Sequence, residues 1–246
     1  LFVFAVAIRF PVALLRGKAA MVQHYRLAGW WLVGCLLGGF SNVDAVYGQK
    51  DESIQNVGEL QKLEMTDVHG KVFRPFENEK LEAFVLVFVS PDCPIANALQ
   101  PELKAIHQRY QKAAVQFYLV YCAPELDVSS CRQHVEDYSV EMPAIMDRGQ
   151  RLGLQTGAKV TPEVVMVKRD GQVAYRGMIN NLYVGYGKKR RSATEHYLND
   201  ACAAILEGKQ PPVTATNPIG CFIYYPPEVE KRNEAKRQRR ETENRN

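Results

Sequence analysis

The sequence has few cysteines, and their spacing matches neither a disulfide scaffold nor a zinc ribbon. Six cysteines are scattered over 246 residues, and no two of them form a C-x-x-C pair. The net charge of +4 is too small to require a nucleic-acid partner. With 46% hydrophobic and 24% charged residues, the composition excludes a mostly disordered chain. The sequence therefore predicts a globular protein with a few thiols, and we expect no nucleic-acid partner.

The first 48 residues have the layout of an export signal. Met21 is the candidate start, and His24 and Arg26 form a short basic stretch after it. An apolar run over residues 27–40 and a small-residue region over 41–48 follow. The run is shorter than the ~20 residues that cross a bilayer, so a cleaved signal is favoured. We therefore expect an exported, periplasmic or extracytoplasmic protein in an oxidising compartment.

Two alternatives would leave the N-terminus on a membrane. The apolar run can be retained as an uncleaved anchor, or the chain can be a lipoprotein. Leu32-Val33-Gly34-Cys35 resembles a bacterial lipobox, which would make Cys35 the lipidated residue. Apolar residues continue after Cys35, where a lipoprotein usually turns polar, so plain export is preferred. Membrane contact is expected only through such an N-terminus.

After a linker at residues 49–57, strands and helices alternate as in an α/β domain. A short hairpin is expected within residues 63–73, and the apolar run 84–89 predicts a strand buried on both faces. Alternation of strands with helices indicates a parallel sheet, which the closing hairpin extends with antiparallel strands. Further helices are expected at 95–112, 128–138 and 194–207, and further strands at 115–121, 143–146, 163–168 and 172–176. The sequence thus predicts a central mixed sheet flanked by helices.

The domain boundaries follow from composition. Residues 58–208 hold the alternating pattern, and Gly208 ends the last helix. Residues 209–225 form a Pro-rich extended tail that contains Cys221. Residues 226–246 are strongly charged with almost no apolar side chains, so we expect a disordered tail there.

Cys93 is the candidate nucleophile. It follows the buried strand directly and precedes a helix. Active sites and ligand sites of open α/β sheets lie at such carboxyl ends of strands. The positive end of the helix dipole favours the thiolate, and Pro94 suits the first helical turn. About seventy residues later, Val160-Thr161-Pro162-Glu163 precedes an edge-hairpin strand, and we expect a cis peptide at Pro162.

Three segments together resemble a bacterial redoxin. They are FVSPDCPIA at 88–96, GAKVTPEVVMV at 157–167 and DGQVAYRG at 170–177. The redoxins belong to the thioredoxin-like superfamily, which includes alkyl hydroperoxide reductases and thiol-specific antioxidant proteins. The resemblance covers residues 57–208 and implies a thioredoxin-like fold.

The resemblance also implies an enzyme whose Cys93 attacks a protein disulfide or a peroxide. An external thiol donor would then reset it. Thr161 and cis-Pro162 would form a wall of the active site, and Ser90, Asp92 and Pro94 would surround the cysteine. The chain departs from thioredoxins because Ala96 replaces the second cysteine. It departs from peroxiredoxins because Leu86 replaces their proline, whereas Ser90 matches their hydroxyl position.

Cys221 is the expected partner of Cys93. From Gly208 to Cys221 the extended chain can span at most ~43 to 47 Å, enough to return across a domain of this size. Gly220-Cys221-Phe222-Ile223 also resembles the close of an exported redoxin subgroup with a D-C-P active site. Cys122 is a rival partner, although Cys122 and Cys131 can instead form a local structural disulfide. Cys202 is expected in the core.

No metal or cofactor site is indicated. Cys122, Cys131 and His134 are too loosely spaced for a metal site, and we expect no cofactor. A redox-silent alternative remains, in which the loop 178–192 and the charged tail hold partners and the thiols do no chemistry. A lowered pKa at Cys93 would favour an enzyme, whereas an ordinary, unreactive thiol would favour this binding module.

Overall fold

The computed structural model describes residue 60, residues 62–229 and the isolated positions 231, 235, 238, 239 and 242. These residues fall within the second of two compact units, Lys50–Asn246. The predictions for the export segment 1–48, including Met21 and Cys35, and for the linker 49–57 lie outside the described residues. Most of the charged segment 226–246 lies outside them as well. Within the described part, no helix is both long enough and apolar enough to cross a membrane.

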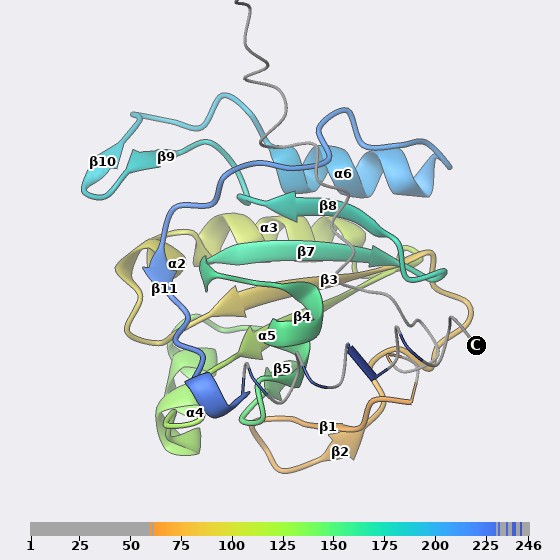
Figure 1. Ribbon diagram of the computed structural model, residues 1–246. Coiled ribbons are helices and arrows are strands. Elements are labelled where there is room, and N and C mark those ends of the chain that lie inside the picture. The colour runs from red at the N-terminus through yellow and green to blue at the C-terminus, as the bar shows by residue number, and fades with distance from the viewer. Residues whose placement is uncertain are drawn as a thin grey trace, which may run out of the picture. The chain divides into compact units, whose positions relative to one another are not determined.

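A five-stranded mixed sheet forms the centre of the domain (Figure 1). Its spatial order is β5-β4-β3-β7-β8. The strands β3, β4 and β5 run parallel, whereas β7 and β8 are antiparallel to their neighbours. Their bounds are β3 Ala83–Val89, β4 Val115–Tyr121, β5 Ala144–Met146, β7 Glu163–Lys168 and β8 Val173–Gly177. The predicted parallel sheet with an antiparallel closing hairpin is confirmed.

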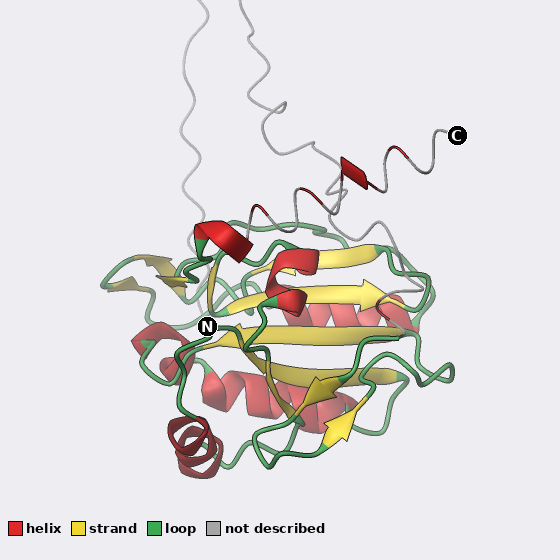
Figure 2. Cartoon of the chain, turned by 60° about the horizontal axis from the view of Figure 1, so that its bottom comes forward, coloured by secondary structure: helices red, strands yellow, loops and turns green. Residues whose placement is uncertain are grey.

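The two faces of the sheet are covered by different elements (Figure 2). Alternate residues of β3 enter two separate apolar clusters, because successive strand side chains point to opposite faces. One face packs against α2 Pro94–Ala98, α3 Gln100–Tyr110, α4 Val128–Asp137 and α6 Tyr197–Leu206. The other packs against the hairpin of β1 Met65–Thr66 and β2 Val72–Phe73 and against α5 Arg151–Thr156. This is the thioredoxin-like arrangement that the sequence predicts.

The helix expected at 95–112 is divided, and this corrects the sequence prediction. Leu99, with φ −96° and ψ −2°, ends α2 and begins α3. Pro101 lies in the first turn of α3 and has no N–H to donate to the preceding turn. The residue before a proline also disfavours helical geometry, which weakens a continuous helix at this point. As a result, Cys93 precedes a helix of only five residues.

Several short elements near the edge of the sheet were not expected. The segment read as a loop before Pro162 contains β6 Val160–Thr161, and α5 precedes it. The loop 178–192 folds back as a hairpin of β9 Tyr183–Gly185 and β10 Lys188–Lys189. The tail contributes β11 Cys221–Phe222, which lies beside α2 at the left of Figure 1. β6, β11 and the β9–β10 hairpin lie near the end of β3 that is followed by Cys93.

Candidate active site

Cys93 is held at the start of α2 and is almost completely enclosed. Its backbone N–H donates to the carbonyl of Ser90 at 3.1 Å, closing a tight turn after β3. Its side chain is only 1% exposed and belongs to the apolar cluster that contains α3 and α6. In the thiol form, Sγ donates to the carbonyl oxygen of Thr161 at 2.8 Å. The expected neighbours, Cys93 and Thr161, are therefore in direct contact.

The tail brings Cys221 to this site by forming a strand. β11 pairs antiparallel with β6, with Cys221 opposite Thr161 and Phe222 opposite Val160. The Thr161–Pro162 peptide bond, which follows β6, is cis. The Thr161 hydroxyl donates to the carbonyl of Cys221, and Ile223 N–H donates to Lys159 at 2.9 Å. The Cys221 side chain is close enough to the Cys93 sulfur that each thiol affects the pKa of the other.

The two sulfurs have opposite acidities. Burial acts most strongly on Cys93 and would raise its pKa. Hydrogen bonding with Thr161, with the Ala96 and Cys221 backbone and with the Cys221 side chain outweighs burial, so the pKa lies below 9.0. Burial, together with the hydrogen bond and charge of Cys93, raises the pKa of Cys221 to about 11. Of the pair, Cys93 is therefore the thiol that ionises at the lower pH, and Cys221 stays protonated to a higher pH.

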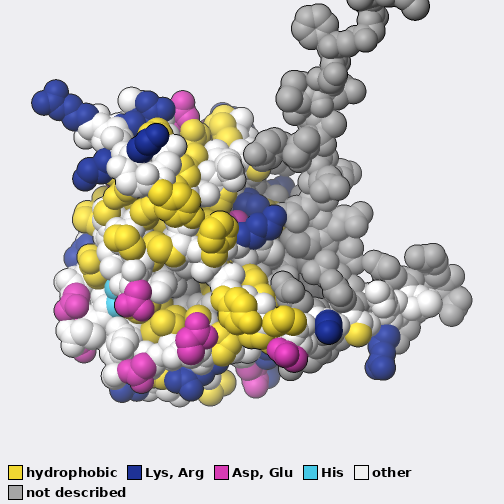
Figure 3. All heavy atoms as spheres, turned by 60° about the vertical axis from the view of Figure 1, so that its left-hand side comes forward, with side chains coloured by type: hydrophobic (Ala, Val, Ile, Leu, Met, Phe, Trp, Pro, Cys, Tyr) yellow, Lys and Arg dark blue, Asp and Glu magenta, His cyan; other side chains and the backbone are white. Residues whose placement is uncertain are grey.

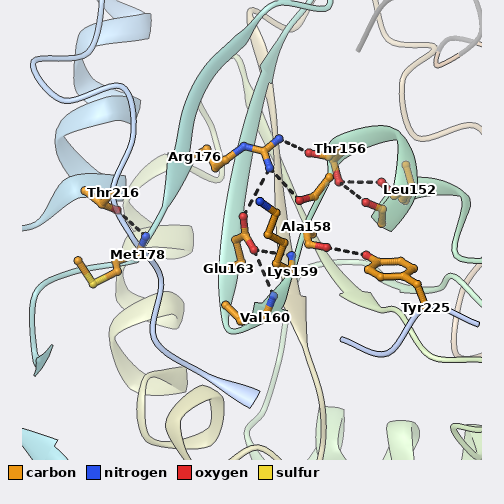
Figure 4. Close-up of polar contacts among 12 residues, drawn as sticks. Leu152, Thr156, Ala158, Lys159, Val160, Glu163, Arg176, Met178, Thr216 and Tyr225 are labelled. Carbon is orange, nitrogen blue, oxygen red and sulfur yellow. Dashed lines mark hydrogen bonds and ion pairs between the residues drawn. The ribbon is translucent and has the colours of Figure 1, made fainter. Parts of the chain in front are cut away.

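A buried carboxylate holds the loop before β7 in shape. Glu163, which is 2% exposed, accepts the backbone N–H groups of Lys159 and Val160 at 2.7 and 3.3 Å. On its other side lies Arg176, with Nη1 3.7 Å from Oε1 of Glu163. Arg176 also donates to the carbonyls of Gly157 and Thr156 (Figure 4). This cluster ties α5 and β6 to β8 and so fixes the strand against which Cys221 lies.

A second polar chain supports the loop that carries Cys93. Asn97 donates through Nδ2 to the carbonyl of Pro91 at 2.7 Å, so its Oδ1 is free to accept from His134 Nε2 at 2.9 Å. Burial lowers the pKa of His134, which favours the neutral ring. Nδ1 must then accept from the Tyr121 hydroxyl, 2.7 Å away. His134 is thus a positioning residue for the 90–93 turn.

The tail is fastened on both sides of Cys221. Upstream, Thr216 N–H donates to the Arg176 carbonyl at 2.9 Å, and the Thr216 hydroxyl accepts from Met178 N–H at 2.8 Å. Downstream, the Tyr225 hydroxyl donates to the Ala158 carbonyl at 2.7 Å (Figure 4). Between them, the hydroxyl of Tyr186 in the β9–β10 hairpin donates to Gly220. The 178–192 segment therefore contacts the tail at the residue next to Cys221.

The remaining thiols lie away from this pair. Cys122 and Cys131 belong to the two apolar clusters on opposite faces of the sheet, and both are free. The possible disulfide between them is not formed, because β4 separates the side chains. Cys122 contacts Tyr225 and Gly153 rather than Cys93, which removes the geometric basis for it as a rival partner. Cys202 is fully buried in the core, and burial raises its pKa to about 12.

The other predicted wall residues differ in exposure. Ser90 is half-buried and contributes its carbonyl to the turn, whereas Asp92 and Pro94 are exposed. Sequence reasoning missed Glu163, Arg176, His134 and Asn97, which act only through contacts between distant segments. Gly220 was noted only as part of the Gly220-Cys221-Phe222-Ile223 motif, and no role was predicted for it. In the described part of the chain, no cluster of three or more side chains could hold a metal ion.

Comparison with known proteins agrees with this architecture. A hypothetical protein of Sinorhizobium meliloti superposes with a TM-score of 0.60 at 24% identity, over 67% of this chain and 91% of its own. An uncharacterised conserved protein of Geobacillus kaustophilus gives a TM-score of 0.58, also at 24% identity, over 67% and 89%. Both likenesses show the fold alone. No curated protein matches the sequence significantly. The family model described as Redoxin matches residues 51–182, more than half of the sequence, and the chain therefore belongs to the Redoxin family.

Proposed function

We propose that this protein is an exported two-cysteine thiol-disulfide oxidoreductase. The Cys93 thiolate attacks a disulfide, forming a bond to one substrate sulfur while the other leaves as a thiolate. Cys221 loses its proton and attacks Cys93, which releases the second substrate thiolate and leaves a Cys93–Cys221 disulfide. Two electrons thus pass from the cysteine pair to the substrate, and an external thiol donor returns them. Export rests on the expected signal in residues 1–48.

The observation that carries this proposal is the position of Cys221. Cys221 pairs with Thr161 across the two strands, and the Cys93 sulfur contacts the same Thr161, so the tail brings a second thiol beside Cys93 in a chain that lacks C-x-x-C. The lowered pKa of Cys93 supports nucleophilic chemistry and speaks against the redox-silent binding module.

A second candidate substrate is a hydroperoxide. Cys93 is 1% exposed, and β11 occupies the β6 edge on which an extended polypeptide could pair. A small oxidant needs a smaller opening than a polypeptide does. In that reaction Cys93 takes one peroxide oxygen to become a sulfenic acid, the alcohol or water leaves, and Cys221 condenses with it to the disulfide.

The two reactions are separated by parallel turnover assays of the full chain with excess glutathione as reductant. One assay uses a chromogenic aryl disulfide, and the other uses hydrogen peroxide. Cys93→Ser should abolish turnover in both without unfolding the protein, while Cys202→Ala, a core thiol, should retain it. Turnover that survives in Cys93→Ser would overturn the proposed function.

A further inference from the structure

The disulfide expected between Cys93 and Cys221 would have two very different sides. Cys93 is 1% exposed and is packed among the apolar side chains beneath α2, including Ile95 and Ala96. Cys221 is half-buried on a two-residue outer strand, and its neighbour Phe222 is 82% exposed. Of the two sulfur-bearing residues, Cys221 is therefore the more accessible to solvent.

The difference in exposure between Cys93 and Cys221 matters because a thiolate can attack a disulfide only from certain directions. A thiolate displaces one sulfur of a disulfide along the line of the S–S bond, from the side opposite the leaving sulfur. Attack on Cys93 would have to come from the side away from Cys221, the side on which the substrate sulfur also leaves in the proposed function. Because Cys93 is only 1% exposed, this side gives an external thiolate less access than the half-buried Cys221 does. Attack on Cys221 comes from the side away from Cys93, and Cys221 is only half-buried although it packs against the same apolar cluster.

Resting on the proposed function, we propose that external thiols reduce this protein by attacking the sulfur of Cys221, which makes the tail cysteine the exchange site. The incoming thiolate bonds to Cys221, the S–S bond breaks, and its electron pair leaves on Cys93. A second thiolate then attacks the external sulfur of this mixed disulfide. It releases an external disulfide and frees Cys221, which takes up a proton.

The acidities of the two thiols support the same direction. A thiol of lower pKa leaves faster, and the pKa of Cys93 is lowered whereas that of Cys221 is raised to about 11. Expulsion of Cys93 is therefore favoured over expulsion of Cys221.

The surface around the tail strand suits an incoming thiolate. Exposed apolar side chains include Val184 and Tyr186 of the hairpin and Phe222 and Tyr224 of the tail. Lys188 and Lys189 are exposed on the same hairpin, whose Tyr186 contacts Gly220. Figure 3 shows hydrophobic side chains gathered on the face with β9, β10 and β11, with lysine and arginine at its margin. Positive charge near the site raises the local concentration of an anionic thiolate.

The test maps the first product of reduction. The oxidised full chain is checked for the Cys93–Cys221 link, mixed briefly with glutathione, quenched in acid and alkylated with N-ethylmaleimide under denaturing conditions. Peptide mass mapping should find glutathione on Cys221 and maleimide on Cys93, in about tenfold excess over the reverse pattern. Cys122→Ser, which removes the buried thiol that contacts Tyr225 of the tail, should give the same product.

The outcomes are distinct. Glutathione on Cys93 with maleimide on Cys221 would overturn this inference and leave the proposed function standing. A glutathione adduct that disappears in Cys122→Ser would overturn it as well. If the oxidised chain holds no Cys93–Cys221 link at the outset, the proposed function and this inference fail together.

Discussion

The backbone of Gly220 lies directly against the carbonyl group of Thr161. A Cβ built on Gly220 would fall less than 3.0 Å from both the carbon and the oxygen of that carbonyl, closer than real Cβ atoms come. Only glycine permits the tail to approach so closely, because any side chain would meet backbone that cannot rotate away. This contact sets the position of Cys221 beside Cys93.

Gly220→Ala should lift the tail from β6. We expect a loss of about 1–3 kcal/mol in the free energy of unfolding, as for other overpacked sites. We also expect several-fold faster alkylation of native Cys93 by iodoacetamide, since the covering strand is displaced. Gly149→Ala is the matched control, because its Cβ would meet only Arg151 side-chain atoms at ordinary distances of 3.6 and 3.8 Å. Equal alkylation rates in the two variants would show that Gly220 does not hold the tail in place.

The acidities of the cysteine pair predict two pH windows in the stability of the reduced protein. Because the pKa of Cys93 lies below 9.0, the native state binds fewer protons than the unfolded chain between that pKa and 9.0. Stability must rise with pH in this window, and the contribution is lost as the pH falls through the native pKa. Each unit of difference is about 1.4 kcal/mol.

For Cys221 the sign is reversed. Its pKa is raised to about 11, so the native state binds more protons between 9.0 and 11, and stability falls there. Urea unfolding of wild type, Cys93→Ser and Cys221→Ser across this range separates the two contributions. As the pH rises toward 9.0, the free energy of unfolding of the wild type should increase relative to that of Cys93→Ser. Above 9.0, it should decrease relative to that of Cys221→Ser. A wild type that tracks Cys93→Ser at every pH below 9.0 would mean that the Cys93 thiolate is not stabilised.

His134 should matter for both stability and reactivity. His134→Leu leaves the part-buried Asn97 Oδ1 without its partner, whereas the Tyr121 hydroxyl keeps the Cys131 carbonyl at 3.3 Å. We expect a loss of about 1–3 kcal/mol in the free energy of unfolding. Because Asn97 also holds the Pro91 carbonyl, alkylation of Cys93 should depend differently on pH in this variant. His69→Leu, at an exposed turn, is the control. A destabilised variant with an unchanged pH profile would assign His134 a purely structural role.

The sequence predicts the parts of this protein that depend on local patterns. The apolar run at 84–89 identifies β3, and its end locates Cys93. The cis peptide bond between Thr161 and Pro162 was predicted from a proline that directly precedes a strand of the closing hairpin. The helix break at Leu99 could have been found, since Pro101 signals it two residues later. The sheet order and the gathering of the tail at the active site agree with the expected topology.

Local sequence patterns do not predict contacts between segments that are distant along the chain. Glu163 is an ordinary strand residue in the sequence, and only the fold brings Arg176 and the Lys159 N–H to it. The possible Cys122–Cys131 disulfide illustrates the same limit. Short separation along the chain made it plausible, but strand alternation turns Cys122 to the face opposite Cys131.

The proposed function requires one covalent link, the disulfide between Cys93 and Cys221. The reduced full chain is treated with one equivalent of hydrogen peroxide or of oxidised glutathione, blocked with N-ethylmaleimide and digested for mass mapping. We expect a peptide pair joined through Cys93 and Cys221, with Cys122, Cys131 and Cys202 carrying maleimide. A Cys93 joined to any other cysteine of the chain, or a Cys221 that stays alkylated while Cys93 is oxidised, would contradict it.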